Sequence, residues 1–566
     1  MRSDRFSTHE EIKTVLEKDS DKAGVGLFYD NGKIYTHSGE SNVLVLGVPG
    51  SGKSSTFSYM TAYNILKNKE SLIVVDPKAE VLNRTYELAK KNHDVYVINF
   101  RNPSKSDGVN LLREIHLMYT SEDPDLRLKG IELLNEYAMV IYPDSPSGVD
   151  PFWVESARSL FTGSCLCLFD IASEDQINLE SVFNFVTEGE KRIGSNRAID
   201  EIVESLLSDS LAKRELNGYV NAPRETRMSV YSVWSNGFRH MVQSESITDM
   251  LCSNDGLKIN NLTGKKPVAI YIVLPDENKI YGKLASIIIS LITTHYIRLA
   301  EQKYNGRLQV RTHVLVEELA NIAPIPNLQH LLSAGRSRNL RVYVVLQAYS
   351  QLESVYGKDA EAIKDCFDIT IAYRVNNYQT LEELSKRCGQ KISCLKNYHI
   401  VEPVITPTEI GAFAIRQCLV IISGRYKYIT SLPFFSDIVT EYDGKIPELK
   451  VKPRTKRPAP FDIKAVAEQY HEEKIQRILN SSPYKENDFC PSSPRKIKYE
   501  EELTKEDIED LNKRITEALK EIDKELKDAK DTAIKNNDNK SDLLNYNFAN
   551  NLKDFLDDEE FESVGE

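Results

Sequence analysis

Apolar residues follow two patterns along the chain, and each pattern occupies its own part of the sequence. Short continuous runs rich in Val and Ile are typical of strands that are buried on both faces of a sheet. The first three runs alternate with helical segments, so we expect a mainly parallel α/β sheet. The runs lie at residues 43–46, 71–78, 94–100, 267–274, 311–318, 341–347, 368–373 and 418–424.

The pattern changes between the third and the fourth run. From about residue 115 to 260, apolar positions recur at helical spacing, as in DPFWVESARSLFTGSCLCLFDIA, and strand-like runs are missing. We therefore predict an all-α domain over 115–260, inserted between the two parts of a sheet domain, 41–114 and 261–440. Residues 1–40 are polar with several Gly turns, and they predict a small lead-in hairpin.

The sheet pattern ends near residue 440. The stretch KIPELKVKPRTKRPAP is basic and rich in proline, so residues 441–500 are predicted to be a linker. Residues 501–535 carry one apolar stripe with three- and four-residue steps on a highly charged background, which predicts an amphipathic helix. Residues 536–566 predict a disordered acidic tail.

Composition and charge add limits to this picture. The chain is 41% apolar and 28% charged, as in ordinary soluble globular proteins. Its longest apolar stretch, LASIIISLITTHYI, is too short to cross a bilayer and predicts a buried core helix. The eight cysteines include no C-x-x-C pair, which argues against zinc and disulfides.

The net charge of −12 at first argues against nucleic-acid binding. However, residues 541–566 hold eight acids and one Lys and contribute −7 of it. The remaining chain is close to balanced, so a basic DNA-binding surface stays compatible with the composition.

One motif directly follows the run at 43–46. The stretch GVPGSGKSS matches G-x-x-x-x-G-K-[ST], a turn whose backbone N–H groups cradle phosphates at the start of a helix. Lys53 is expected to reach the β- and γ-phosphates of ATP, and the Ser54 hydroxyl to ligate Mg²⁺. The predicted nucleotide-binding residues are Gly47, Val48, Pro49, Gly50, Ser51, Gly52, Lys53, Ser54 and Ser55.

Hydrolysis also needs carboxylates, and the run HVLVEE supplies two at the end of a strand. We expect Glu317 to hold Mg²⁺ and Glu318 to polarise the attacking water. Gln347 ends the next run and is placed to sense the γ-phosphate. Arg336 and Arg338 precede that run, at the opposite sheet edge. Arg336 is therefore predicted to act on a neighbouring subunit's nucleotide as an arginine finger, unless the two arginines are only surface charges.

Several stretches together resemble the TraG/TraD-like coupling ATPases of conjugative type IV secretion. They are GVPGSGKS, VVDPKAE, DPFWVESAR, PVAIYIVLPDENKIY, VEELANIAPIPNL, LLSAGRSRNLRVYVVLQAYSQLESVYG and TPTEIGAF, in the family's order. The resemblance implies a RecA-like DNA translocase with an all-α insertion. It supports the roles given to Lys53, Ser54, Glu318, Arg336 and Gln347. Asp76 matches a family position near the nucleotide, without a role that the sequence explains.

The resemblance also implies partners. They are DNA, most simply single-stranded, relaxase or relaxosome proteins, a secretion-channel ATPase, and a homo-hexamer when active. Two features depart from the family pattern. The family usually has Asp where this chain has Glu317, and it usually begins with two membrane helices. We therefore expect a soluble cytoplasmic form, monomeric in isolation, that reaches the inner face of the membrane through a separate anchoring partner.

Two other functions stay open. Another RecA-like DNA translocase or helicase would share the phosphate loop, the carboxylates and the ring. A recruitment scaffold that binds nucleotide with little hydrolysis is also compatible, and Glu317 is the main argument for it. A small-molecule P-loop kinase fits poorly, because such kinases rarely need this length or an all-α insertion.

Overall fold

The computed structural model describes residues 4–481, apart from 19–22, 146–147, 149, 243, 276–279, 396–397, 425–426, 441, 443, 453 and 455–456. The predicted amphipathic helix (501–535) and acidic tail (536–566) lie outside the described residues.

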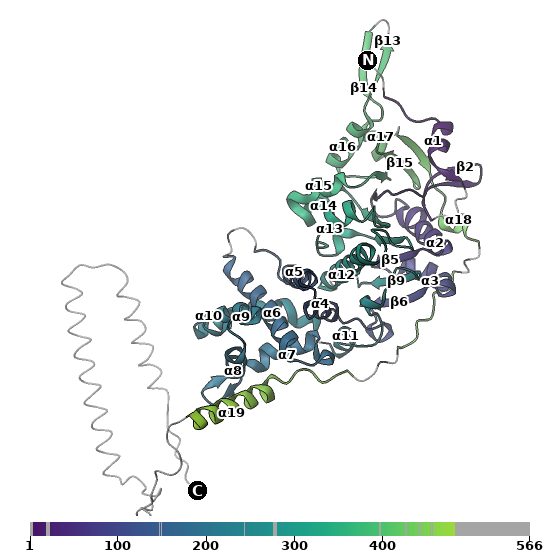
Figure 1. The fold of residues 1–566 in the computed structure, drawn as a ribbon. Coiled ribbons are helices and arrows are strands. Elements are labelled where there is room, and N and C mark those ends of the chain that lie inside the picture. Colours follow the sequence, from purple (N-terminus) through teal and green to yellow (C-terminus); the bar gives the residue numbers. More distant parts are fainter. Residues whose placement is uncertain are drawn as a thin grey trace, which may run out of the picture. The chain divides into compact units, whose positions relative to one another are not determined.

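A nine-stranded sheet forms the centre of the described part (Figure 1). Its strand order is β16-β15-β12-β4-β11-β10-β5-β9-β6, and only β15 and β16 run antiparallel to their neighbours. The bounds are β4 Val43–Leu46, β5 Ser71–Asp76, β6 Asp94–Asn99, β9 Val268–Val273, β10 Thr312–Val316, β11 Leu340–Leu346, β12 Ile369–Ala372, β15 Gln417–Ile422 and β16 Tyr428–Ser431.

Each of the eight predicted apolar runs overlaps one of these strands, and β11 and β15 begin one residue before the predicted run. The central strands β4, β5, β9, β10 and β11 are buried at every position, which explains their continuous apolar runs. The ninth strand, β16, was not predicted, because it is a four-residue edge strand with a partly exposed, alternating pattern.

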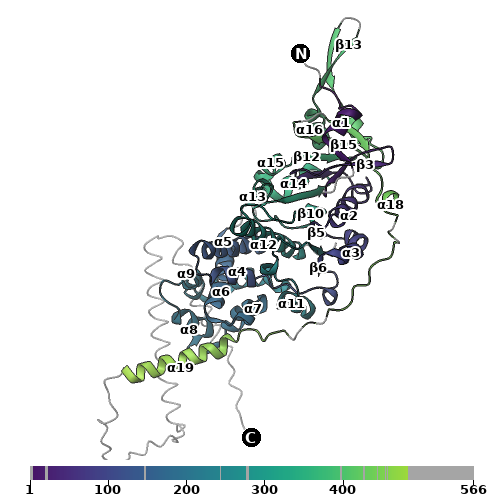
Figure 2. The same ribbon diagram turned by 45° about the vertical axis from the view of Figure 1, so that its right-hand side comes forward.

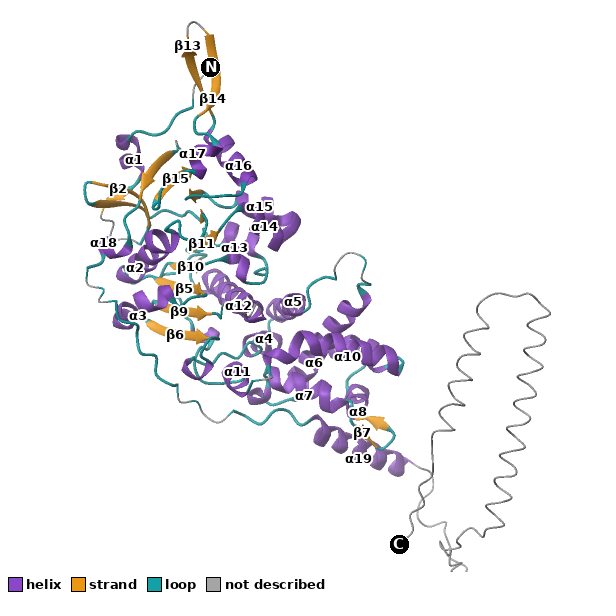
Figure 3. Ribbon diagram, turned by 180° about the vertical axis from the view of Figure 1, so that it is seen from behind, coloured by secondary structure: helices purple, strands orange, loops and turns teal. Residues whose placement is uncertain are grey.

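Helices cover both faces of the sheet, so that the strands lie between them (Figure 3). Alternate residues of one strand serve the two faces: Leu44 and Leu46 belong to one apolar core, and Val43 and Val45 to the other. The second core includes α2 Tyr59–Lys67 and α3 Glu80–Asn92. The first includes α12 Ile280–Lys303, α13 Leu328–Ala334, α14 Tyr349–Tyr356, α15 Ala360–Asp365 and α16 Tyr378–Cys388.

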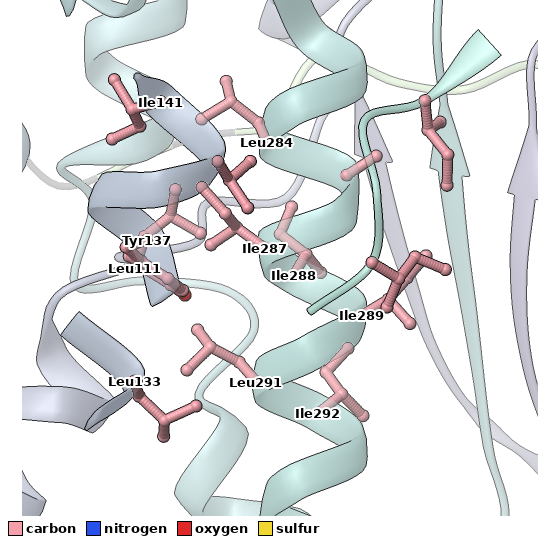
Figure 4. Packing of buried hydrophobic residues seen from close by; sticks show 14 of the residues in the cluster. Leu111, Leu133, Tyr137, Ile141, Leu284, Ile287, Ile288, Ile289, Leu291 and Ile292 are labelled. Carbon is pink, nitrogen blue, oxygen red and sulfur yellow. The ribbon is translucent and has the colours of Figure 1, made fainter. Parts of the chain in front are cut away.

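Helix α12 contains the longest apolar stretch of the chain. Among the described residues it is long and apolar enough to cross a membrane, yet most of it is buried inside the protein. Its side chains Leu284, Ile287 and Leu291 face residues Tyr137 and Leu133 of the neighbouring helix α5 Pro124–Ile141 (Figure 4). The helix is therefore a core helix, as predicted.

The all-α region lies between β6 and β9, which are themselves parallel neighbours in the sheet. It therefore interrupts a crossover between adjacent strands. Trp234 is fully buried at its centre and stacks on Phe183 and Phe238, at centroid distances of 5.7 and 5.4 Å. The region contains one short β-ribbon, formed by β7 Arg192–Ile193 and β8 Asn196–Arg197. Its α-helices are α4 Arg113–Tyr119, α5, α6 Phe152–Ile171, α7 Leu179–Gly189, α8 Ala198–Ser205, α9 Leu211–Val220, α10 Arg224–Phe238 and α11 Glu245–Leu251.

The N-terminal residues form helix α1 His9–Val15 and a three-stranded sheet of β1 Glu17–Lys18, β2 Val25–Asp30 and β3 Lys33–His37. The chain start lies beside a second hairpin, β13 Gln390–Leu395 with β14 Tyr398–Pro403 (Figure 2), where the backbone N–H of Asp4 donates to the carbonyl of Gln390 at 3.0 Å. Two short helices, α17 Pro407–Gly411 and α18 Phe435–Ile438, complete this part.

The range predicted as a linker contains a helix in the structure, α19 Ile463–Ser481. Phe461, Ile463 and Ala467 are buried in the first apolar core, and the guanidinium of Arg457 pairs with Glu180 at 2.9 Å. The prolines that indicated a linker end at Pro460, and apolar residues at helical spacing follow them. The linker prediction is therefore wrong for residues 463–481, and residues 482–500 of the predicted linker lie outside the described residues.

Candidate functional site

The predicted phosphate loop joins β4 to a π-helical turn, Ser54–Ser58, which continues as α2. Gly52 has φ +100°, and an added Cβ would lie 3.4 Å from the backbone nitrogen of Arg416. Both the backbone angle and the crowding explain why glycine occupies this position. The loop is tied to its surroundings by backbone hydrogen bonds, including one of 3.2 Å from the Arg416 N–H to the Ser51 carbonyl.

A cavity of ≈ 250 Å³ opens between this loop and the carboxyl ends of β10, β11 and β5. Parallel sheets typically bind ligands at this edge. The predicted site residues that line it are Pro49, Gly50, Gly52, Lys53, Ser54, Ser55, Glu317, Glu318 and Gln347. Gly47, Val48 and Ser51 belong to the loop but do not line the cavity, and neither do Asp76 and Arg336.

The Lys53 ammonium turns back onto its own loop. Its Nζ donates to the carbonyls of Gly47 and Val48, the latter at 3.1 Å. Burial lowers the pKa of Lys53, while the charges of Glu318 and Glu317 oppose that shift. The cation is therefore held at the cavity wall beside both carboxylates, where phosphate oxygens can replace the two carbonyls.

Glu317 lies buried at the end of β10, and its Oε1 atom accepts no hydrogen bond within the described part of the chain. Burial raises the pKa of Glu317 and the Glu80 charge adds to that, while the hydroxyls of Ser58 and Ser54 and the Lys53 ammonium lower it. A carboxylate oxygen without a partner beside the Ser54 hydroxyl is a set of hard oxygen donors that fits Mg²⁺.

Glu318 directly follows, in a left-handed conformation (φ 62°, ψ 65°) that is uncommon outside glycine and asparagine. The turn brings its carboxylate to the Nε2 of Gln347, which donates a hydrogen bond to Glu318 Oε1. The ends of β10 and β11 thus place an acceptor and an amide side by side. This arrangement can orient a water molecule towards a bound phosphate.

Arg336 lies before β11, at the sheet edge opposite to the cavity. Its Nη1 pairs with Asp368 Oδ1 at 2.8 Å, and its side chain is 43% exposed. Arg338 pairs instead with Glu301. Neither arginine reaches the cavity of its own chain, so a role for Arg336 across a subunit interface stays a prediction.

Asp76 ends β5 and is fully buried. Its two carboxylate oxygens accept the N–H groups of Glu80 at 2.9 Å and Leu82 at 2.8 Å. Burial, together with the Glu317 charge, raises the pKa of Asp76 to about 7, although both hydrogen bonds oppose the shift. Asp76 therefore shapes the turn between β5 and α3 rather than lining the cavity.

The sequence prediction missed part of the cavity wall. Lys78 was within reach of sequence reasoning, because it follows a predicted strand whose carboxyl end faces this edge. Tyr59 and Glu80 line the cavity only because of how α2 and α3 pack, whereas Pro77 directly follows β5 and Val345 and Leu346 belong to β11. The missed residues are Tyr59, Pro77, Lys78, Glu80, Val345 and Leu346.

Comparisons with known proteins identify the family of this chain and solved structures with a similar fold. The family model for type IV secretory system conjugative DNA transfer matches residues 3–393. Conjugal transfer protein TraG of Rhizobium radiobacter is 26% identical over 361 residues, 62% of this chain and 52% of that protein. TraG of Agrobacterium fabrum (strain C58 / ATCC 33970) is 25% identical over 359 residues, 62% and 51% respectively. The chain spans about half the length of these curated relatives.

Among solved structures, the fold is similar to the plasmid coupling protein TrwB. TrwB with the non-hydrolysable GTP analogue GDPNP has a TM-score of 0.57 at 18% identity, covering 76% of this chain and 94% of that chain. TrwB with ADP and Mg²⁺ has a TM-score of 0.55 at 18% identity, covering 81% and 96%. The predicted fold class, a RecA-like P-loop NTPase domain with an inserted all-α domain, is confirmed.

Proposed function

Because the chain belongs to the type IV secretory system conjugative DNA transfer family, we propose that it is an ATP-driven coupling protein. It would recruit a DNA or relaxase–DNA substrate and feed it to a conjugation channel. One observation carries the proposal: the phosphate loop, the Glu317–Glu318 pair and Gln347 converge on a single cavity.

The residues of the cavity account for each part of ATP hydrolysis. The loop N–H groups and Lys53 bind the phosphates, and Ser54 and Glu317 hold Mg²⁺. When bound, Mg²⁺ neutralises charge on the phosphate oxygens. Glu318 accepts a proton from the water that attacks the γ-phosphorus, while the bond to the β–γ bridging oxygen breaks and ADP leaves. Gln347 orients Glu318 and the water.

The position of Arg336 supports the assembly of several subunits into a ring. Its exposure on the edge opposite to its own cavity suits a contact with the nucleotide of the next subunit, where it stabilises the transition-state charge. We propose a homo-hexamer as the active form, with DNA, relaxosome proteins and a secretion-channel ATPase as partners. The proposed place of action is the cytoplasmic face of the membrane, reached through a membrane-bound partner.

The test is ATP hydrolysis by the purified protein, with and without single-stranded DNA. Low salt is required because phosphate contacts weaken steeply as salt rises. DNA-stimulated turnover that disappears in Lys53→Ala supports a motor. Bound nucleotide without turnover, even with the membrane partner added, contradicts it.

The second outcome would favour a nucleotide-binding scaffold. One observation keeps that function in view: Glu317 stands where the resembling family usually has Asp, and its longer side chain alters the position of the metal-binding oxygen. A third function, another RecA-like translocase or helicase, would be favoured by selective binding to forked DNA.

A further inference from the structure

One wall of the cavity comes from the turn 76–80 between β5 and α3, of which Pro77, Lys78 and Glu80 line the cavity. Lys78 and Glu80 of this turn line the cavity together with Lys53 and Glu318. The proposed mechanism gives Lys78 no role, although it is a second cation in a cavity that is shaped for an anion.

The backbone of this turn is unusually well fixed. Buried Asp76 accepts the N–H groups of Glu80 and Leu82, and the N–H of Ala79 donates to the Asp76 carbonyl at 3.2 Å. The carbonyl of Pro77 accepts Nη2 of Arg101 at 3.0 Å. The hydrogen bonds on either side thus hold the residues that flank Lys78.

Ala79 adopts φ 57°, ψ 22°, the left-handed region that a residue with a Cβ seldom occupies. Such a conformation is unfavourable and persists only where the surroundings enforce it. Here the enforcing group is Asp76, whose carbonyl and carboxylate accept hydrogen bonds from N–H groups of the turn and of the start of α3, and whose burial is itself unfavourable for the carboxylate. The chain therefore accepts two unfavourable features to keep this turn in one shape.

The same turn fixes Glu80. Its carboxylate accepts a hydrogen bond from the Tyr59 hydroxyl, and the Arg84 guanidinium stacks over the Tyr59 ring at 4.0 Å. Glu318 is held by Gln347 in the same way. Both carboxylates on the cavity rim thus already have hydrogen-bond donors.

The side chain of Lys78 differs from its neighbours. It is exposed, and within the described residues it makes no hydrogen bond or ion pair. A rigid turn thus presents one uncommitted ammonium to the cavity, across from Lys53. Lys53 follows β4 and Lys78 follows β5, and β11 and β10 lie between these two strands in the sheet. A triphosphate that runs from the loop towards Glu317 and Glu318 at the end of β10 would therefore bring its terminal phosphate to the side of the cavity that Lys78 lines.

We propose that Lys78 binds the γ-phosphate of ATP and makes the cavity discriminate ATP from ADP. This inference rests on the proposed ATP-binding function. Lys78 is then a catalytic residue that contacts the transferred phosphoryl group. After hydrolysis this contact would be lost next to the start of α3, which begins at Glu80.

The test compares nucleotide affinities by calorimetry, in the presence of Mg²⁺, for a non-hydrolysable ATP analogue and for ADP. Lys78→Met keeps the aliphatic stem and removes the charge, Lys78→Arg keeps the charge, and Lys91→Met removes an exposed charge from the last turn of α3 as a matched control. Because Lys78 and Lys91 are exposed, these variants are expected to fold, which circular dichroism checks.

Lys78→Met should weaken the ATP analogue about tenfold or more, the size of a lost charge-assisted contact, and change ADP less than twofold. Lys91→Met should bind both nucleotides as the parent protein does, and Lys78→Arg should regain most of the affinity for the ATP analogue that Lys78→Met loses. An unchanged ratio of the two affinities in Lys78→Met, or an equal loss for both nucleotides, overturns the inference while leaving ATP binding intact. If the parent protein binds neither nucleotide, the proposed function fails as well.

Discussion

The buried carboxylate of Asp76 makes a prediction about stability that is independent of turnover. Its pKa is raised from 3.8 to about 7, chiefly by burial and then by the charge of Glu317. At a pH between these two pKa values, Asp76 is mostly protonated in the folded protein and mostly ionised in the unfolded chain. The free energy of unfolding therefore decreases as pH rises through the folded pKa. From pH 6 to pH 8, this single group should lower the stability by roughly 1 kcal/mol.

Asp76→Asn should remove this pH dependence. The amide cannot ionise, so the variant lacks the decrease between pH 6 and pH 8. The substitution instead lowers the free energy of unfolding by an amount that does not depend on pH, because the new NH₂ group faces one of the two N–H donors that the Asp76 carboxylate accepts. That cost is about 1–3 kcal/mol for an unpaired buried donor. Subtracting the two pH profiles cancels the titrating groups that do not interact with Asp76, and leaves the contribution of Asp76 and of its interaction with Glu317.

Urea unfolding followed by far-ultraviolet circular dichroism, at pH 6, 7 and 8, measures both terms. Tryptophan fluorescence is unsuitable as the only signal, because Trp153 and Trp234 both lie in the all-α region. Nucleotide and Mg²⁺ are left out, since a cation at Glu317 would remove part of the repulsion. Parallel profiles for the two proteins, or a parent protein that gains stability towards pH 8 relative to the variant, would refute the reasoning.

Three further predictions concern the chemistry. Lys53→Ala should abolish nucleotide-stimulated activity and keep the native circular dichroism spectrum; normal ATP hydrolysis in this variant would show that the site is misassigned. Glu318→Gln should bind ATP yet slow its hydrolysis by about 10²-fold or more, because the base is lost; unchanged turnover would place the base elsewhere. Arg336→Ala should regain part of its activity when mixed with Lys53→Ala, because each subunit supplies what its neighbour lacks; no recovery at any mixing ratio would remove the support for action in trans.

Local sequence patterns were sufficient to predict most of the strands and the fold class. Eight strands could be located because a strand that is buried on both faces needs a continuous apolar run, a property of four to eight neighbouring residues. The phosphate loop was found for a similar reason: Gly52 and Lys53 lie a fixed number of residues apart, and the loop geometry depends on that spacing. The fold class then followed from the alternation of strands and helices, with the RecA-like assignment added by the resemblance.

Local patterns were misleading where packing decides. The proline-rich stretch predicted a linker up to residue 500, but α19 forms from Ile463 because Phe461, Ile463 and Ala467 find an apolar surface on the all-α region. Propensity alone does not decide whether such a helix forms, since most of the stability of a helix in a protein comes from burying one face.

The candidate site shows the same division. The sequence by itself placed Lys53 in a phosphate loop that follows one apolar run, and Glu318 and Gln347 at the ends of two others. Only the tertiary structure decided that β4, β11, β10 and β5 are neighbours in this order, which brings Glu318 to Gln347 and Lys78 to the same cavity. Strand order depends on how all helices and strands pack at once, and no short window of sequence contains that information.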